Sequence, residues 1–159
     1  MWKLIQHIVP LLALGMFAAC GSESEQEVYS QFVHFPGGEW CREEPCYFKP
    51  CVAGDKFGVK LSVMHGSEYE YADIVLTMDV VSGDTLALRK NVMLPLIDDN
   101  GNWTSDGFGS VYQYRVPVAD GVRLDSTSVI LLWQSMSCDT LRHISRVGID
   151  ITKIKTDDY

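Results

Sequence analysis

Apolar and polar side chains alternate with a period of two along most of the chain after residue 28. Within residues 57–64, the apolar positions are Phe57, Val59, Leu61 and Val63. Successive side chains of a β-strand point to opposite faces of a sheet, so this alternation predicts strands with one buried face. Residues 74–80 repeat the pattern, and helical spacing is scarce. The alternation therefore predicts an all-β fold.

Turn signals divide this pattern into short strands. Gly83 and Asp84 separate two alternating segments and predict a hairpin, and Asn100-Gly101 predicts a second tight turn. The predicted strands cover residues 29–35, 45–49, 57–64, 74–80, 85–89, 109–118, 127–136 and 147–153. Only residues 138–145 could hold a helical turn. Short strands at this turn spacing predict a single β-sandwich with a jelly-roll-like arrangement.

The N-terminal segment has the pattern of an export signal. Lys3 precedes an apolar run over residues 8–19, which is shorter than the about 20 residues that a membrane-spanning helix needs. The run ends in Phe17-Ala18-Ala19-Cys20, which resembles the lipobox of bacterial lipoproteins. An ordinary secretory signal is the alternative. We expect cleavage before Cys20 and lipidation of Cys20 with acyl chains such as palmitate, which would anchor the protein to a membrane.

These signals predict four segments in the chain. Residues 1–19 are the signal peptide, 20–27 the lipidated cysteine with a flexible stalk, 28–154 the β-sandwich domain and 155–159 a tail. The stalk assignment rests on acidic, polar residues without packing side chains. The residues after Cys20 favour the outer membrane as the location, and they leave open whether the domain faces the periplasm or the cell surface.

Length and charge narrow the classes of partner. The chain has 159 residues, 13 of them basic and 21 acidic, with a formal net charge of −8. This length is typical of one domain. Phosphate backbones are bound by clustered cations, and the sequence has no Lys/Arg-rich run, so we expect no nucleic-acid partner.

The order of motifs along the mature chain carries a family resemblance. The lipobox is followed by Phe35-Pro36-Gly37-Gly38-Glu39-Trp40, Gly83-Asp84-Thr85-Leu86, Asp99-Asn100-Gly101-Asn102-Trp103 and Val147-Gly148-Ile149. In this order the chain resembles the gliding-motility-associated lipoproteins of the GldH family of Bacteroidota. The resemblance implies an envelope lipoprotein that gliding species need for motility and that is linked to their secretion-coupled machinery.

Four cysteines remain if Cys20 carries lipid: Cys41, Cys46, Cys51 and Cys138. An even number of cysteines in an exported protein predicts disulfide bonds, and three pairings are possible. A single disulfide and reduced buried thiols are alternatives to two disulfides. A zinc site is another, although the two-residue spacing typical of such sites is absent.

Motifs for catalysis and metal binding are absent from the sequence. His34, His65 and His143 are isolated, and no nucleophile elbow or phosphate loop accompanies them. Asp98–Asn102 lacks the Gly and Glu positions of an EF-hand, so a tight turn is expected there. We therefore expect no catalytic residues, no metal and no cofactor, and hence a protein that is not an enzyme.

Trp40 and Trp103 are the binding candidates, because both lie in turn-rich segments where an aromatic face can be exposed. The alternative is that both plug the ends of the sandwich. Two functions follow from these observations. The first, which the family resemblance implies, is an interaction subunit of a gliding-motility or secretion-associated assembly, with other envelope proteins as partners. The second is a surface glycan-binding lipoprotein.

Overall fold

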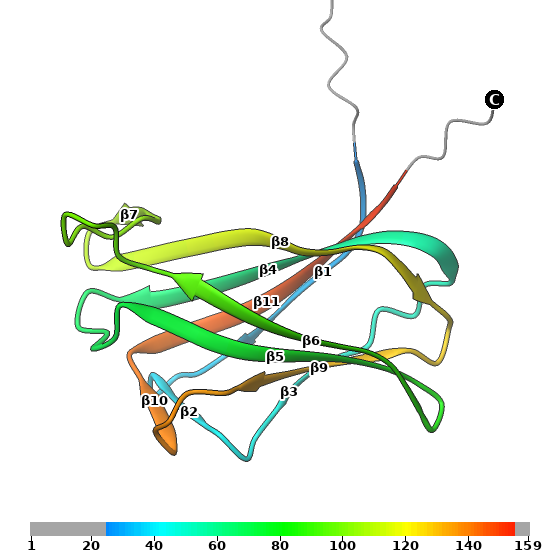
Figure 1. Cartoon of the computed structure of the whole chain (residues 1–159), viewed down its shortest axis with the longest axis horizontal. Coiled ribbons are helices and arrows are strands. Elements are labelled where there is room, and N and C mark those ends of the chain that lie inside the picture. Colours follow the sequence, from blue (N-terminus) through cyan, green and yellow to red (C-terminus); the bar gives the residue numbers. More distant parts are fainter. Residues whose placement is uncertain (1–24, 155–159) are drawn as a thin grey trace, which may run out of the picture.

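The computed structural model describes residues 25–154, apart from the side chains of Asp55 and Asp106. Two antiparallel sheets pack face to face in this part of the chain, which contains eleven strands and no helix (Figure 1). Accordingly, no helix long and apolar enough to cross a membrane is found between residues 25 and 154. Cys20, the signal peptide and the tail 155–159 lie outside the described residues.

The larger sheet has five strands in the order β1-β11-β4-β8-β7. Their bounds are β1 Gln26–His34, β11 Ile144–Lys153, β4 Gly54–Gly66, β8 Val111–Leu124 and β7 Asp106–Phe108. Gln26 pairs with Lys153, so the start of β1 and the end of β11 lie side by side. The sheet therefore includes the last two residues of the predicted stalk.

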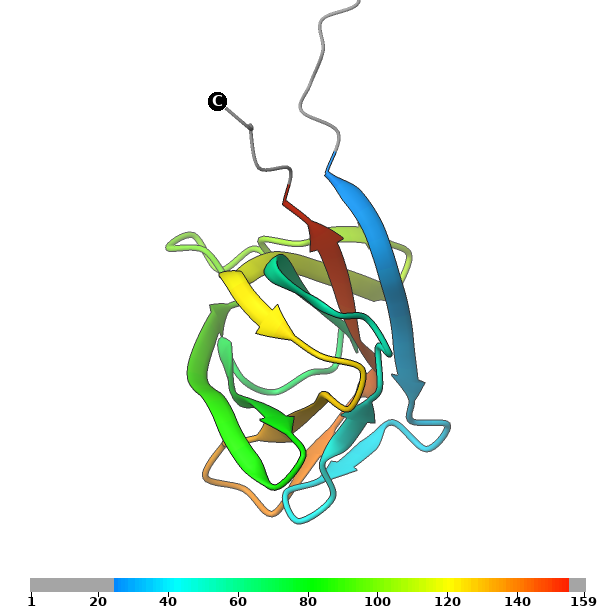
Figure 2. The same ribbon diagram turned by 90° about the vertical axis from the view of Figure 1, so that its right-hand side faces the viewer.

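The smaller sheet has four strands in the order β3-β9-β5-β6. Their bounds are β3 Cys46–Phe48, β9 Val129–Gln134, β5 Asp73–Ser82 and β6 Thr85–Pro95. A separate pair of short strands, β2 Glu39–Cys41 and β10 Thr140–Arg142, lies at one end of the sandwich. Figure 2 shows the sheets curving around the space between them.

The core fills this space with apolar side chains from both sheets. The central strands of the larger sheet contribute Val59, Leu61, Val63, Val147, Ile149 and Ile151, and the smaller sheet contributes Phe48, Ile74, Leu76, Met78, Ile130 and Leu132. All of these side chains are buried. Burying one such side chain stabilises the fold by roughly 1.5–3 kcal/mol, which explains why the period-two pattern determines the strands.

The structure confirms the all-β sandwich, whereas the jelly-roll-like arrangement stays a prediction. The sequence allows a helical turn within residues 138–145, but the structure has none there, because Thr140–Arg142 form the strand β10. Leu141 pairs with Trp40 across β10 and β2, and both side chains are buried. Burial of this pair outweighs the local tendency of the segment to turn.

Candidate functional site

The outward-pointing side chains of the smaller sheet form a mixed apolar and polar surface, which we call the outer face. Strand register places its residues in rows across β9, β5 and β6. One row holds Leu131, Asp79 and Arg89, and the next holds Trp133, Thr77 and Asn91. At its margins, Tyr47 is 63% exposed and Met93 is 67% exposed.

Asp79 is a buried carboxylate in the middle of the outer face. Its two oxygens accept hydrogen bonds from Nε and Nη2 of Arg89, both at 2.7 Å. The hydrogen bonds from Arg89 lower the pKa of Asp79, because they stabilise its charged form. Asp79 thereby holds the guanidinium of Arg89 over the outer face.

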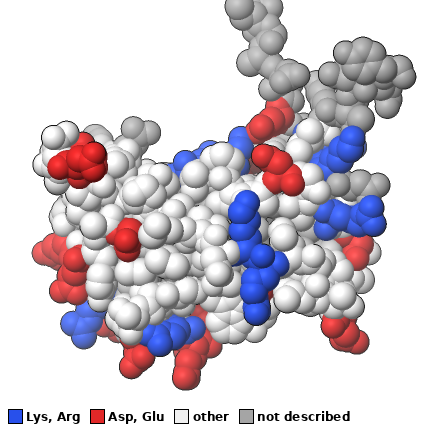
Figure 3. Space-filling model, in the orientation of Figure 1, with Lys and Arg blue, Asp and Glu red and all other residues white. Residues whose placement is uncertain are grey.

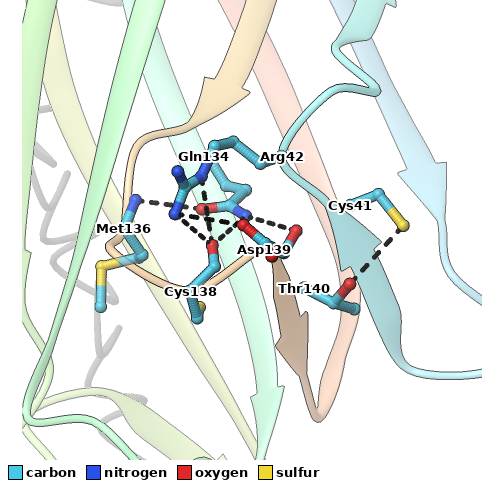
Figure 4. A network of polar contacts seen from close by, with 7 residues as sticks. All are labelled: Cys41, Arg42, Gln134, Met136, Cys138, Asp139 and Thr140. Atoms are coloured by element: carbon cyan, nitrogen blue, oxygen red, sulfur yellow. Dashed lines mark hydrogen bonds and ion pairs between the residues drawn. The ribbon is translucent and has the colours of Figure 1, made fainter.

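Arg42 reaches the same face from the connection between β2 and β3. Its Nε and Nη2 donate to the carbonyl oxygen of Cys138 at 3.2 and 2.8 Å. The side-chain amide of Gln134 donates to the same oxygen at 3.2 Å. Figure 4 shows Arg42 and Gln134 converging on the turn at Cys138 and Asp139. This turn holds the guanidinium of Arg42 beside the end of β9.

A shallow pocket of about 330 Å³ lies between these groups. Its lining residues come from four separate segments of the chain: Arg42, Thr77, Arg89, Trp133, Gln134, Ser135 and Met136. The lining contains two cationic side chains and no carboxylate. Sequence reasoning missed this pocket, because no local motif links residues that strand pairing brings together from positions 42 to 136.

Strand β6 forms one edge of the smaller sheet and pairs within the described residues with β5 only. It is eleven residues long, and most of its side chains are exposed, including Leu86 at 49%. About half of the backbone N–H and C=O groups of an edge strand point away from its sheet and can accept another strand. β6 is therefore a long hydrogen-bonding edge.

The other long edge strand, β1, lies against a neighbouring segment. β1 contacts β3 of the smaller sheet, and Val28 and Tyr29 on β1 pack against the core. Burial is the main cause that raises the pKa of Tyr29. β6 is thus the less covered of the two long edges.

The two predicted binding tryptophans lie in packed surroundings. Trp40 is 1% exposed, stacks on Phe35 with ring centroids 5.4 Å apart, and donates its indole N–H to the carbonyl oxygen of Glu44. Trp103 is half-buried, and its ring centroid lies 4.6 Å from that of His65. Trp40 thus plugs the core, as the second interpretation of the sequence had it, and it presents no face to a ligand.

His65 is buried inside an aromatic cluster formed by Tyr69, Trp103 and Tyr112. Its Nδ1 lies 3.0 Å from the carbonyl oxygen of Gly66, whereas its Nε2 has no hydrogen-bond partner in the described part of the chain. Burial lowers the pKa of His65, because it disfavours the charged imidazolium. The cluster encloses this histidine.

His34 and His143 lie on the surface or near it. His34 is exposed on β1, and Nδ1 of His143 lies 3.5 Å from a carboxylate oxygen of Glu68. Among residues 25–154, no group of three His, Cys, Asp or Glu side chains could hold a metal ion.

The acidic turn at Asp98 binds its own backbone. Asp98 Oδ1 accepts hydrogen bonds from the backbone N–H groups of Asn100 at 2.9 Å and Asn102 at 2.8 Å. The bond from the Asn102 backbone is the main cause that lowers the pKa of Asp98. Gly101 has a φ of 82°, so the segment is the tight turn that the Asn-Gly pair predicts.

The four described cysteines are free thiols in this structure. Cys46 is buried and faces Leu132 across β3 and β9, and burial raises its thiol pKa to about 12. Cys51 is exposed, and Cys41 and Cys138 are half-buried. Disulfide pairing therefore stays a prediction of the sequence, which thiol counting on the unreduced protein tests.

Residues 27–151 match the model of a family described as GldH lipoprotein. No curated protein matches the chain. A solved exo-inulinase from Aspergillus awamori is 14% identical with a TM-score of 0.35, and the match covers 84% of this chain and 30% of that chain. Two structures of the Tobacco streak virus coat protein are 12% and 14% identical, each with a TM-score of 0.25. They match over 82% of this chain and over 91% and 93% of their own length.

Proposed function

Because this chain belongs to the GldH lipoprotein family, we propose that it is a non-enzymatic interaction subunit of a gliding-motility or secretion-associated assembly. Family membership makes it a gliding-motility-associated, membrane-anchored lipoprotein of the cell envelope. The finer parts of the proposal are anchoring to the outer membrane through Cys20 and binding of another envelope protein. The observation that carries the binding role is the long, uncovered edge of β6.

The occupant that fits this edge is a β-strand of another envelope protein. A strand that adds to a sheet edge gains affinity from backbone hydrogen bonds and specificity from alternate side chains. β6 offers eleven residues for such pairing, with Leu86 and Met93 as exposed apolar contacts near its two ends. Lys90 lies exposed at its midpoint. A complementary strand would place a carboxylate opposite this cation.

A second copy of the chain fits the edge less well. In a symmetric antiparallel pair of two β6 strands centred on residue 90, the two Lys90 side chains would lie opposite each other. Like charges directly opposite across two strands are destabilising. Charged side chains on an edge strand are also a common means by which proteins avoid self-association. The charge of β6 therefore favours a partner of different sequence.

Crosslinked co-purification of the full-length lipoprotein from native membranes tests this proposal. Lys90→Glu and Met93→Glu should each lower the recovery of the crosslinked partner about tenfold or more, which corresponds to a loss of about 1.4 kcal/mol in binding. Lys56→Glu is the matched control, because Lys56 is exposed on β4 of the other sheet. All variants should melt within a few degrees of wild type. Unchanged recovery with both β6 variants, or no partner with wild type, would contradict the proposal.

A further inference from the structure

The pocket on the outer face has the composition of a ligand site, and the edge proposal does not use it. We propose that it binds carboxylate-bearing sugar units, so that the protein recognises an acidic glycan. This inference goes beyond the proposed function, because strand addition at β6 needs no pocket. It rests on the indole of Trp133, the two arginines beside it and the charge balance of the lining.

Trp133 provides an aromatic platform whose orientation is set by the sheet. Strand register places Trp133 directly opposite Thr77, whereas Asp79 is the diagonal neighbour on β5. Trp133, Thr77 and Asn91 form one row across the outer face, so the Trp133 ring lies on the sheet surface beside these polar side chains. Trp133 is half-buried, and its remaining surface contributes to the pocket. A ring held in this way can stack against the C–H face of a pyranose at little cost in side-chain entropy.

The two guanidinium groups are also held in place before a ligand arrives. Nε and Nη2 of Arg42 donate hydrogen bonds to the carbonyl oxygen of Cys138, and the same two atoms of Arg89 donate to the carboxylate of Asp79. The hydrogen bonds and ion pairs of both arginines within residues 25–154 use Nε and Nη2. An arginine carries five N–H donors, so each keeps donors for a ligand. Guanidinium donors of this kind suit carboxylate oxygens.

Charge balance favours an anionic over a neutral ligand. The bidentate pair with Asp79 compensates the charge of Arg89. Arg42 contacts a neutral carbonyl, and its nearest carboxylate is the fully exposed Asp139 at 3.8 Å, where solvent screens the attraction. On the side of the molecule that β6 crosses in Figure 1, Figure 3 shows Lys and Arg side chains near the middle and Asp and Glu mainly around the rim. Because its lining holds two arginines and no carboxylate, the pocket is locally cationic in an acidic protein.

Size and hydroxyl groups favour a sugar over an acidic peptide. A volume of about 330 Å³ lies at the lower end of the range for small-ligand pockets, which suits one or two sugar rings. The hydroxyl groups of Thr77 and Ser135 lie 2.7 Å apart at the pocket, next to Asn91. They can exchange hydrogen bonds with sugar hydroxyls. An acidic peptide would use the arginines but would gain little from the indole platform.

Titration of the full-length protein in detergent micelles with trigalacturonic acid tests the inference, with maltotriose as the neutral sugar and triglutamate as the acidic peptide. Trigalacturonic acid should bind saturably and more weakly at high salt. Its Kd should rise about tenfold or more in Trp133→Ala and Arg42→Gln. Arg142→Gln is the matched control, because Arg142 is an exposed arginine outside the pocket whose nearest carboxylate, Glu39, is 3.8 Å away.

Ser135→Phe is a second variant, which tests the inference even if Trp133→Ala fails to fold. Residue 135 is exposed, so the new phenyl ring should fill the pocket without disturbing the core. It should also abolish binding at an unchanged melting temperature. Three outcomes would overturn the inference: no saturable binding of trigalacturonic acid, maltotriose binding that equals it, or triglutamate binding that equals it and survives Trp133→Ala. The last outcome would identify an acidic-peptide site. A failure of the crosslinking test at β6 would not change the outcome of this titration, so the two proposals can fail independently.

Discussion

At the scale of single residues, each sheet carries a buried aspartate on its outward side. Asp79 lies under Arg89, and Asp150 of the larger sheet lies 2.7 Å from Arg115 and accepts a hydrogen bond from Ser30 at 2.6 Å. A buried carboxylate is costly unless it is paired and hydrogen-bonded. Both aspartates meet this requirement with an arginine that extends over the sheet surface. These pairs therefore set the positions of cationic groups on both outward faces.

The Asp79–Arg89 pair predicts a dependence of stability on pH. The folded-state pKa of Asp79 is below its unfolded value of about 4. The contribution of Asp79 to the free energy of unfolding is therefore complete above the unfolded pKa, and it is lost as the pH falls through the folded pKa. Asp79→Asn should therefore lower the free energy of unfolding at pH 7 by about 1–2 kcal/mol and reduce its fall between pH 5 and pH 3. Urea unfolding at several pH values measures both effects.

Some acid sensitivity should remain in this variant. Hydrogen bonds from Asn102 and Thr127 lower the pKa of Asp98 and Asp125 in the same direction. Asp84→Asn, in an exposed turn, is the control and should change neither quantity. An Asp79→Asn variant with the same pH dependence as wild type would show that the pair contributes no pH-linked stability.

Burial of Trp40 predicts a large loss of stability on truncation. Trp40→Ala removes a fully buried indole, its stacking on Phe35 and a hydrogen bond to Glu44, so the free energy of unfolding should fall by about 3–5 kcal/mol. Tyr47→Ala, at an exposed position on β3, should change it by about 0.5 kcal/mol or less. Denaturant unfolding compares the two. Equal effects would mean that Trp40 is not a core residue in solution.

At the scale of elements, the sequence predicts the long strands because each has one buried face. Residues 57–64 and 74–80 lie within β4 and β5, where the apolar side chains point into the core. The predicted strand at 85–89 is too short, because β6 continues to Pro95. As an edge strand it exposes most positions, including Lys90 and Asn91, and the alternation is weak there. Because most side chains of β6 are exposed, the apolar–polar alternation that would mark the end of this strand is missing from the sequence.

Three of the four shortest strands, β2, β7 and β10, could not be predicted from the sequence, and neither could the pocket. β2, β7 and β10 have three residues each, too few to show a period of two. Their existence depends on pairing between segments distant in sequence, such as Trp40 with Leu141. The same holds for the pocket, which joins Arg42, Arg89 and Trp133 from unconnected segments. Trp133 looks in the sequence like one more apolar residue of a buried strand.

The edge position of β6 predicts opposite outcomes for two neighbouring prolines. Adjacent backbone N–H groups of a strand point to opposite sides of the strand. Of the residues Lys90 and Asn91, one therefore donates its N–H to β5 and the other directs its N–H to the free edge. Proline has no N–H, so one of the variants Lys90→Pro and Asn91→Pro loses a hydrogen bond to β5, whereas the other loses a donor on the free edge. One variant should lower the melting temperature clearly. The other should leave it nearly unchanged and reduce partner crosslinking. Thermal unfolding followed by circular dichroism separates them, and equal destabilisation by both would show that β6 is not a free edge.

At the scale of the whole molecule, both ends of the described chain leave the sandwich on the same side (Figure 1). The paired start of β1 and end of β11 account for this arrangement. Gln26 follows Cys20 by six residues, which span at most about 20 Å when extended. If Cys20 carries lipid, the domain stays close to the membrane. The partner strand and the glycan must then be available within this distance of the surface.

Lipid anchoring at Cys20 predicts a change of location without a change of fold. The described sandwich begins after Cys20, so Cys20→Ala should leave unprocessed or unlipidated protein that melts at the wild-type temperature. It should no longer incorporate labelled fatty acid, because the only proposed acceptor thiol is gone. Cys51→Ala is the matched control, since Cys51 is an exposed cysteine within the described residues. It should retain the label and fractionate with outer membranes. If Cys20→Ala kept both the label and the outer-membrane location, another residue would be the anchor, and the limit of about 20 Å on the position of the domain would no longer hold.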